Sequence, residues 1–221
     1  MDFLDAFTSA GASKPTREQK KDWKTKNAKT LIEGAHLMES TIPPAGRTMR
    51  VLRELKPETI TPKKDKSIHV RTQAEINMIG AIIALLQADP ADEVVIATYT
   101  LNKEALDILC ELIDAGRIKN LKLMMASSVG FRDPKQKELM IKRALERRGN
   151  FQLSFAYSHF KITTIKTGGN YYHIEGSMNY SRNNAAENIV ISNCKKLYDF
   201  DHHFICNIML DTGHKAVEII C

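Results

Sequence analysis

Apolar positions in the first part of the chain follow the spacing of an α-helix. Between Thr16 and Met38 they recur at intervals of three and four residues, as on one face of a helix. The run Pro43-Pro44-Ala45-Gly46 ends this segment, and a second, short helix is predicted over 49–55. We therefore predict a helical extension over residues 1–66, ahead of a main domain over 67–221.

After residue 66, apolar runs of strand length alternate with segments of helical spacing. The predicted strands cover 68–70, 93–99, 121–126, 151–157, 160–165, 171–174 and 188–192, and the predicted helices cover 72–87, 102–116, 133–149 and 197–208. Tight turns are expected between the three strands from 151 to 174, including a hairpin turn at Gly168-Gly169-Asn170. Alternating strands and helices followed by neighbouring strands predict an α/β fold, in which a mixed β-sheet is flanked by helices on both faces.

The net charge of the chain indicates which class of partner it binds. The chain is basic, with a formal net charge of +6 and a pI of about 9.1. Such a balance favours a polyanionic partner, with nucleic acid first and an anionic membrane surface second. Basic residues crowd the first thirty positions, so the extension is predicted either to contact a phosphate backbone or to present a solvated face to a partner subunit.

The spacing of the cysteines and the absence of targeting features indicate the cellular compartment of the protein. The four cysteines are scattered and lack the spacing of a metal site: Cys110, Cys194, Cys206 and Cys221. The first residues do not resemble a signal peptide, and no apolar run approaches the length of a transmembrane segment. These features predict reduced thiols and a cytoplasmic protein.

A histidine, a lysine, a Gly-Ser turn and a carboxylate follow one another within one stretch of the chain. His159 and Lys161 are two residues apart, so on a strand their side chains would lie on the same face. An imidazole beside a fixed positive charge suits phosphoryl chemistry, because one group attacks phosphorus and the other neutralises its oxygens. Gly176-Ser177-x-Asn179 adds donors for those oxygens. Glu187 can hold the far ring nitrogen and fix the tautomer of the imidazole.

The ordered set of His159-x-Lys161, Gly176-Ser177-Met178-Asn179 and Glu187 resembles the phospholipase D superfamily. Within it, the chain is similar to the short, single-motif bacterial and phage members that include metal-independent nucleases. The resemblance covers roughly Ile68 to Met209. One position departs from the pattern, because the family's aspartate five residues after the lysine is here Lys166. That aspartate usually has a structural or orienting role, so the His-Lys-Asn-Glu set is intact without it.

The resemblance implies a phosphodiesterase that needs neither a metal nor another cofactor. Its catalytic residues would be His159, Lys161, Asn179 and Glu187, and Gly176 and Ser177 would bind the substrate. In-line displacement at phosphorus needs a nucleophile on one side and a proton donor on the other. One histidine cannot stand on both sides, so a chain with a single motif is expected to form a C2 homodimer with a composite site.

Other polar residues have plainer interpretations. His173 is predicted to be a structurally satisfied histidine beside the motif. Arg132 follows the end of a predicted strand and Arg182 follows the Gly-Ser turn, so both are candidates for contact with substrate, although 127–132 is itself expected to be a plain loop. A further group is interpreted as the polar face of one helix with a buried cysteine, in preference to a zinc site: Asp199, Asp201, His202, His203 and Cys206.

The leading hypothesis is thus a nuclease that acts on DNA or RNA as a homodimer, with a phage or host protein as a further partner. A first alternative is a phospholipase or phosphatidyl transferase. Such an enzyme is expected to expose an apolar helix, which the sequence does not clearly show. A second alternative is a catalytically silent, nucleic-acid-binding protein of the same fold, suggested by Lys166 at the family's aspartate position.

Overall fold

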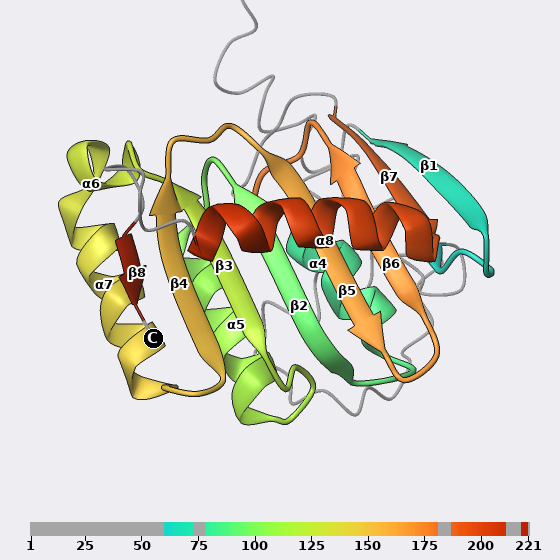
Figure 1. Ribbon diagram of the computed structural model, residues 1–221, viewed down its shortest axis with the longest axis horizontal. Helices are drawn as coiled ribbons and strands as arrows, with labels where there is room; N and C mark the ends of the chain where they lie inside the picture. The colour runs from blue at the N-terminus through green and yellow to red at the C-terminus, as the bar shows by residue number, and fades with distance from the viewer. Residues whose placement is uncertain (1–59, 73–77, 181–186, 211–217, 221) are drawn as a thin grey trace, which may run out of the picture. The chain divides into compact units, whose positions relative to one another are not determined.

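The computed structural model describes residues 60–72, 78–180, 187–210 and 218–220. The two helices predicted before residue 60 lie outside these ranges, so the helical extension over 1–66 stays a prediction. The described residues form a mixed, eight-stranded β-sheet with helices on both faces (Figure 1). The predicted fold class is confirmed.

The sheet has the strand order β1-β7-β6-β5-β2-β3-β4-β8. Its strands are β1 (Lys66–Thr72), β2 (Ala91–Thr98), β3 (Leu121–Ala126), β4 (Phe151–Ala156), β5 (Lys161–Thr167), β6 (Tyr171–Gly176), β7 (Glu187–Asn193) and β8 (Glu218–Ile220). β2, β3 and β4 are parallel neighbours, and the remaining neighbours are antiparallel. The parallel pairs are those whose strands are connected by a helix, as a parallel crossover requires. Every predicted strand is present, and β8 is an addition.

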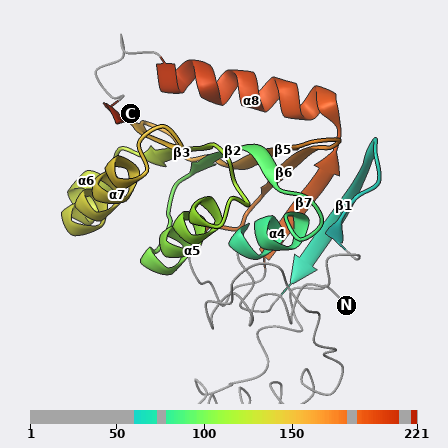
Figure 2. The same ribbon diagram turned by 90° about the horizontal axis from the view of Figure 1, so that it is seen from below.

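Helices cover the sheet on both faces, as Figure 2 shows: α8 lies on one face, and α4, α5 and α7 lie on the other. The helices are α4 (Met78–Leu85), α5 (Lys103–Asp114), α6 (Val129–Arg132), α7 (Pro134–Glu146) and α8 (Lys195–Leu210). The prediction of a plain loop over 127–132 is wrong, because this segment contains the one-turn helix α6. Its turn is closed by hydrogen bonds from Arg132 N to Ser128 O at 3.1 Å and from Asp133 N to Val129 O at 2.9 Å.

The ends of α5 and α7 follow from local chemistry. The side chain of Asn102 accepts a hydrogen bond from the Ala105 amide at 2.8 Å, and that of Asp133 accepts one from the Gln136 amide at 3.0 Å. Each therefore satisfies an amide that the first turn of the helix leaves free. Beyond the other end of α5, Gly116 has φ +68°, a left-handed conformation that favours glycine. These predicted boundaries are confirmed.

The main core lies between the sheet and the helices α4, α5 and α7. Every residue of α4 is buried, which explains why its sequence is apolar on all sides. α5 buries one face, which carries Leu106, Leu109 and Leu112, against strands that contribute Ile96 and Leu123. Each fully buried leucine or isoleucine contributes about 2 kcal/mol to folding. This layer holds the parallel strands, and with them their carboxyl ends, in place.

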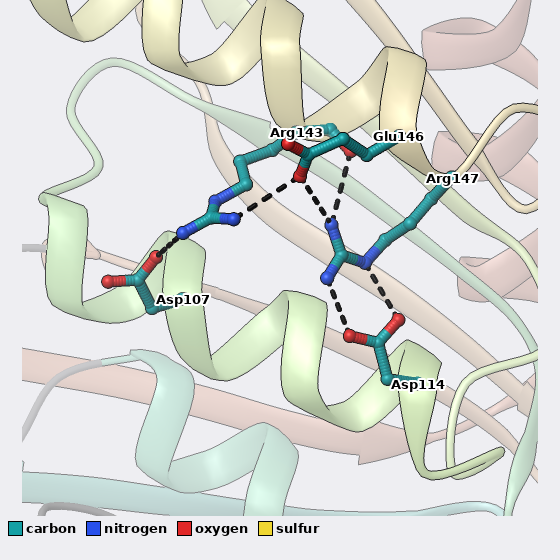
Figure 3. Close-up of polar contacts among 5 residues, drawn as sticks. All are labelled: Asp107, Asp114, Arg143, Glu146 and Arg147. Atoms are coloured by element: carbon teal, nitrogen blue, oxygen red, sulfur yellow. Dashed lines mark hydrogen bonds and ion pairs between the residues drawn. The ribbon is translucent and has the colours of Figure 1, made fainter.

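Ion pairs connect α7 to α5 along their exposed sides (Figure 3). Arg147 makes two parallel contacts with Asp114, from Nε to Oδ1 at 2.9 Å and from Nη2 to Oδ2 at 2.5 Å. Arg143 reaches Asp107 at 3.3 Å and Glu146 at 3.2 Å. Two-pronged arginine–carboxylate pairs have a defined geometry, so this network fixes the angle between the two helices and adds about 1 kcal/mol.

α8 packs on the opposite face through a narrow apolar stripe. Ile205 and Met209 are buried against Val95, Ala97 and Met124. Large apolar side chains on its outer side are exposed instead: Leu197, Phe200, Phe204 and Leu210. α8 therefore exposes apolar side chains, a feature that the sequence did not clearly show. Helical periodicity alone did not tell which apolar residues of this helix face the sheet.

The polar residues of α8 have partners on the sheet. Asp201 lies 2.6 Å from Nε2 of His173, which is buried on β6. The interpretation of His173 as structurally satisfied holds for Nε2 only, since Nδ1 is buried without a hydrogen-bond partner among the described residues. His202 lies 2.5 Å from Glu93, which also pairs with Lys122 at 2.5 Å. The interpretation of these residues as the polar face of a helix is confirmed, although Cys206 is only half-buried.

The contact of Glu93 with His202 makes folding stability depend on pH. Burial raises the pKa of Glu93, but hydrogen bonds from His202 and Lys122 outweigh it and lower the pKa from 4.5 to about 2. Hydrogen bonds to Cys206 and Glu93 raise the pKa of His202 from 6.5 to about 9. The raised pKa of His202 stabilises the folded state fully below pH 6.5, and this stabilisation is lost as pH rises through 9. The lowered pKa of Glu93 stabilises the folded state fully above pH 4.5, and this stabilisation is lost as pH falls through 2.

We therefore expect this contact to stabilise the protein most between about pH 4.5 and 6.5, and to lose about 2 kcal/mol on either side. Urea unfolding at about pH 3, 5.5 and 9 measures the free energy of unfolding. The Glu93→Gln variant is the reference, because it lacks the carboxylate that titrates at low pH and loses that carboxylate's share of the His202 shift, whereas the contact with Cys206 remains. A difference between wild type and variant that stays constant across these pH values would contradict the prediction.

The connection between β4 and β5 is not the tight turn that the sequence predicts. β2 and β3 lie between these two strands, so the link over 157–160 crosses them along the edge of the sheet (Figure 1). Three strand spacings amount to about 14 Å. The five peptide units from Ala156 to Lys161 reach at most about 17 Å. The link is therefore nearly extended, and the positions of its residues are tightly constrained.

Candidate active site

The predicted site residues collect at one edge of the sheet. The parallel strands β2, β3 and β4 end there. β5 and β7 begin at this edge, and β6 ends there, because β5 and β7 run antiparallel to β2 and β6 respectively. In open α/β sheets, ligands bind outside the carboxyl ends of parallel strands. Every predicted site residue within the described ranges lies at this edge.

His159 sits on the extended link, directly above the end of β2. Its ring contacts the ring of Tyr99, the residue after β2, with 4.4 Å between centroids. Its Nδ1 lies 3.4 Å from Nζ of Lys161, the first residue of β5. The predicted proximity of imidazole and lysine is present, although His159 precedes the strand. The side chain is exposed, so a substrate phosphate can reach it.

The contact with Lys161 selects one tautomer of His159. An ammonium group can only donate a hydrogen bond, so Nδ1 is the acceptor and a neutral ring carries its proton on Nε2. A histidine that protonates a leaving oxygen must be in the imidazolium form, with both ring nitrogens protonated, so that it becomes a neutral imidazole when it gives up the Nε2 proton. An imidazole that attacks phosphorus through Nε2 needs the opposite tautomer, in which Nδ1 holds the proton and donates it to an acceptor such as a carboxylate.

Ser177 and Glu187 meet where β6 and β7 come together. The Ser177 hydroxyl donates a hydrogen bond to a carboxylate oxygen of Glu187, which is only 8% exposed. The Asn188 amide donates to the same hydroxyl at 3.0 Å, and the Ser177 amide donates to the Asn188 carbonyl at 3.0 Å. Lys161 lies one strand away, because the β5–β6 register that pairs Ile162 with Glu175 continues toward it. Serine, lysine and carboxylate therefore share one small area.

Asn179 lies on a short segment that passes from β6 over the end of β5 to the residues after β2. Its carbonyl accepts from the Met78 amide at 3.4 Å, and the Tyr180 amide donates to Thr100 O at 3.3 Å. Tyr180 is fully buried, and its hydroxyl forms a hydrogen bond with Thr163 of β5. Burial raises the pKa of Tyr180, so the hydroxyl stays neutral. This anchor fixes the backbone that carries Asn179.

One polar atom of Asn179 has no hydrogen-bond partner within the part of the chain that the structure describes. This atom is the side-chain Oδ1, which is buried. Buried polar atoms are nearly always paired in folded proteins. Oδ1 can only accept a hydrogen bond, so it cannot bind a phosphoryl oxygen, and the predicted role of Asn179 in binding would fall to its Nδ2 donor and stays a prediction.

The two predicted arginines have different outcomes. The guanidinium of Arg132, at the end of α6, lies 4.4 Å from the centroid of the Tyr99 ring, on which His159 also packs. Arg132 therefore belongs to the same surface as His159. Arg182 lies outside the described residues, and its predicted contact with substrate stays a prediction.

Lys166, at the family's aspartate position, lies away from this edge. It is five residues after Lys161 on β5, which corresponds to about 16 Å along the strand and to the opposite face of the sheet. Its register partners are Glu93 on β2 and Tyr171 on β6. A residue at this position acts on the packing beneath α8 and does not reach the candidate site. The departure from the family pattern therefore lies outside the candidate site.

The sequence did not single out Tyr99, Phe131 or Tyr157, which also lie at this edge. A signal was present for Tyr99, since an aromatic residue directly after a buried strand stands where α/β sheets bind ligands. Within the described ranges, no three histidine, cysteine, aspartate or glutamate side chains come together in a way that could hold a metal ion. No helix in those ranges is both long and apolar enough to cross a membrane.

No protein-family model matches the sequence, and a comparison with curated proteins gives no match. Among solved structures, the chain is similar to Nuc from Salmonella typhimurium, a phospholipase D family member, at 14% identity over 65% of this chain and 93% of that chain, with a TM-score of 0.49. It is also similar to phosphatidylserine synthase from Haemophilus influenzae Rd KW20, at 9% identity over 94% of this chain and 48% of that chain, with a TM-score of 0.50. Polyphosphate kinase from Porphyromonas gingivalis matches at 14% identity over 63% of this chain and 25% of that chain, with a TM-score of 0.47.

These three proteins are members of the phospholipase D superfamily. The chain has a phospholipase D-like fold. The resemblance stated from the motif residues is therefore confirmed at the level of the fold. Identities this low define shared architecture and leave the reaction and the substrate open.

Proposed function

We propose that the protein is a metal-independent phosphodiesterase that cleaves nucleic acid in a composite, homodimeric site. The observation that carries this proposal is the arrangement at the sheet edge. His159 lies 3.4 Å from Lys161, and the hydrogen-bonded pair of Ser177 and Glu187 lies on the adjoining strands. The superfamily to which the similar structures belong carries out phosphodiester and phosphoryl-transfer chemistry, which agrees with this arrangement.

The proposed reaction has two steps. Nε2 of His159 in one subunit attacks phosphorus, so that a P–N bond forms while the bond from phosphorus to the leaving oxygen breaks. Nε2–H of His159 in the second subunit protonates that oxygen. Water then attacks phosphorus, its proton passes to the second imidazole, and the P–N bond breaks. Each histidine thus returns to its starting state.

Other residues of the site would stabilise charge and orient the nucleophile. Lys161 and Asn179 from both subunits would bind the phosphoryl oxygens, with Ser177 assisting. Glu187 would accept the Nδ1 proton of the attacking His159. In this scheme the positive charge comes from two lysines, so no metal ion is needed.

Nucleic acid is favoured as substrate by the charge of the chain. A net charge of +6 and a pI of about 9.1 suit a polyanion with many phosphates. Lys161 and Arg132 are cationic groups at the site edge. Glu187, the predicted catalytic carboxylate there, already accepts the Ser177 hydroxyl and is nearly buried.

Nicking of supercoiled plasmid in excess EDTA tests the proposal. We expect wild-type protein to retain full activity, because lysine charge replaces the metal ion, with His159→Ala protein as the catalyst-free control. Complete loss of wild-type activity on chelation would contradict the metal-free mechanism. Binding of DNA without any cleavage would support the catalytically silent alternative.

A second candidate function is cleavage or transfer of phospholipid headgroups, and one observation favours it. Phe200 and Phe204 are exposed on α8, and Phe204 packs edge-on against Phe160, the residue next to His159, with 5.9 Å between centroids. An exposed apolar surface that continues to the site edge could rest on a membrane. If the protein hydrolyses fluorescent phosphatidylcholine but does not nick plasmid, the result would favour this second function.

A further inference from the structure

Two aromatic side chains at the site edge are almost entirely exposed. Phe131 on α6 is 91% exposed, and Tyr157, the residue after β4, is 93% exposed. They are the most exposed of the large apolar residues in the described part of the chain. Exposing a ring to water forgoes about 2 kcal/mol of burial, so two such rings beside a candidate site call for a partner.

The backbone segments that carry these rings are adjacent. Tyr157 opens the link that carries His159 two residues later. The carbonyl of Ala156, just before Tyr157, accepts from the Ser127 amide at 2.8 Å, and the Phe131 amide donates to Ser128 at 3.2 Å. The two aromatics therefore rise from backbone segments that are joined by a hydrogen bond.

The residues near the two rings in the chain include cations, each of which lies over a neighbouring ring. The guanidinium of Arg132 follows Phe131 directly and lies over Tyr99 at 4.4 Å. Nζ of Lys137 lies 4.9 Å from the centroid of the Phe155 ring, on the strand that leads to Tyr157. The nearby carboxylate of Asp133 caps α7 through the Gln136 amide at 3.0 Å. Isolated exposed rings on segments that also carry cations suit flat, anionic ligands better than they suit an apolar protein surface, which needs a contiguous patch.

We propose that Phe131 and Tyr157 form a platform on which unpaired nucleobases stack while the adjacent phosphate lies at His159. Every base has a π-face that can stack on an aromatic ring, whereas the bases of a duplex are already stacked on one another. The platform makes single-stranded nucleic acid the preferred substrate class. This inference rests on the proposed function only in taking nucleic acid as the ligand.

Binding of labelled oligonucleotides tests the platform separately from cleavage. Fluorescence anisotropy in EDTA compares a single strand with a blunt duplex of the same sequence, on a His159→Asn background that prevents turnover. We expect Phe131→Ala with Tyr157→Ala to weaken binding of the single strand about tenfold or more. Duplex binding should change less than about twofold, because charge dominates it.

Two control variants and a modified oligonucleotide test whether the loss of single-strand binding comes from the loss of stacking on the two rings. Leu145→Ala removes a leucine that is 47% exposed near the end of α7, where the chain leads into the start of β4 at the opposite edge of the sheet, and should leave binding unchanged. Tyr157→Phe keeps the ring and should retain affinity. A strand with abasic sites should bind wild type as weakly as the intact strand binds the double variant, since both lack one stacking partner.

Several results would overturn the platform. Equal loss for single strand and duplex would indicate a general effect of charge or folding. Dissociation of a wild-type dimer by the double variant in sedimentation would assign the rings to the subunit interface. If the double variant loses binding to anionic phospholipid vesicles but keeps its affinity for the single strand, the rings would be assigned to membrane contact. Base-dependent binding combined with no cleavage by wild type would retain the platform and refute the proposed nuclease, so the two failures are distinguishable.

Discussion

Replacing His159 with alanine is expected to lower the rate of phosphodiester cleavage by about 10⁴-fold or more, because the variant lacks both the nucleophile and the proton donor of the composite site. Initial rates of plasmid nicking in EDTA measure the effect. His69→Ala is the matched control, since His69 is an exposed histidine on the edge strand β1, paired with Val190 of β7. It should cleave like wild type. Activity that survives in His159→Ala protein would exclude the phosphohistidine mechanism.

The same variant tests whether the site is shared between two subunits. When wild-type and His159→Ala subunits are unfolded and refolded together, activity should follow the square of the wild-type fraction, because only dimers with two histidines are complete. An equal mixture should therefore retain about a quarter of the activity. A linear decrease to about a half would mean that each subunit works alone. Light scattering that finds a monomer at micromolar concentration would contradict the shared site as well.

Local patterns predicted most of the fold because they are set by local physics. The strand over 121–126 is an apolar run of β length, and its bounds agree with β3. Asn102 and Asp133 begin helices because their side chains satisfy free amides, and Gly116 follows a helix end because it adopts a positive φ. None of these features depends on distant parts of the chain.

The features that local patterns did not predict depend on long-range pairing. β5 follows β4 after four residues, a spacing typical of a hairpin, yet β5 pairs with β2 through Thr98 and Lys161. That pairing stretches the link across two strands and brings His159 onto Tyr99. The same limitation applies to α8, where helical spacing marks Phe200 and Ile205 equally and only the packed sheet buries Ile205.

In the candidate site, too, some features follow from the local sequence and others from the pairing of distant strands. The residue types and their order were visible in the sequence, because His159, Lys161, Ser177 and Glu187 are defined by chemistry at short spacing. Lys166 counted as a defect in that linear pattern. Strand geometry places it on the opposite face and about 16 Å from Lys161, where it has no access to a phosphate at the edge.

Substituting Gly176 with alanine is expected to lower the free energy of unfolding by about 2–4 kcal/mol and to abolish cleavage. A Cβ at this position would lie 2.1 Å from the carbonyl oxygen of Asn188 and 2.8 Å from Cα of Ile189. Both atoms belong to the backbone of β7, which cannot turn aside as a side chain can. The two strands would have to separate at the point where the site is built. Urea unfolding and plasmid nicking measure the two effects.

Gly168→Ala provides the control, because Gly168 lies in the turn between β5 and β6 and a Cβ there would have nothing within 4 Å. It should keep wild-type stability and activity. The Asn188 carbonyl that an alanine at 176 would strike is also the acceptor for the Ser177 amide at 3.0 Å. A displaced carbonyl would therefore release Ser177 from Glu187 as well. Glycine is needed in the Gly-Ser-x-Asn motif because the neighbouring strand lies too close for any side chain, and wild-type stability in Gly176→Ala protein would refute this explanation.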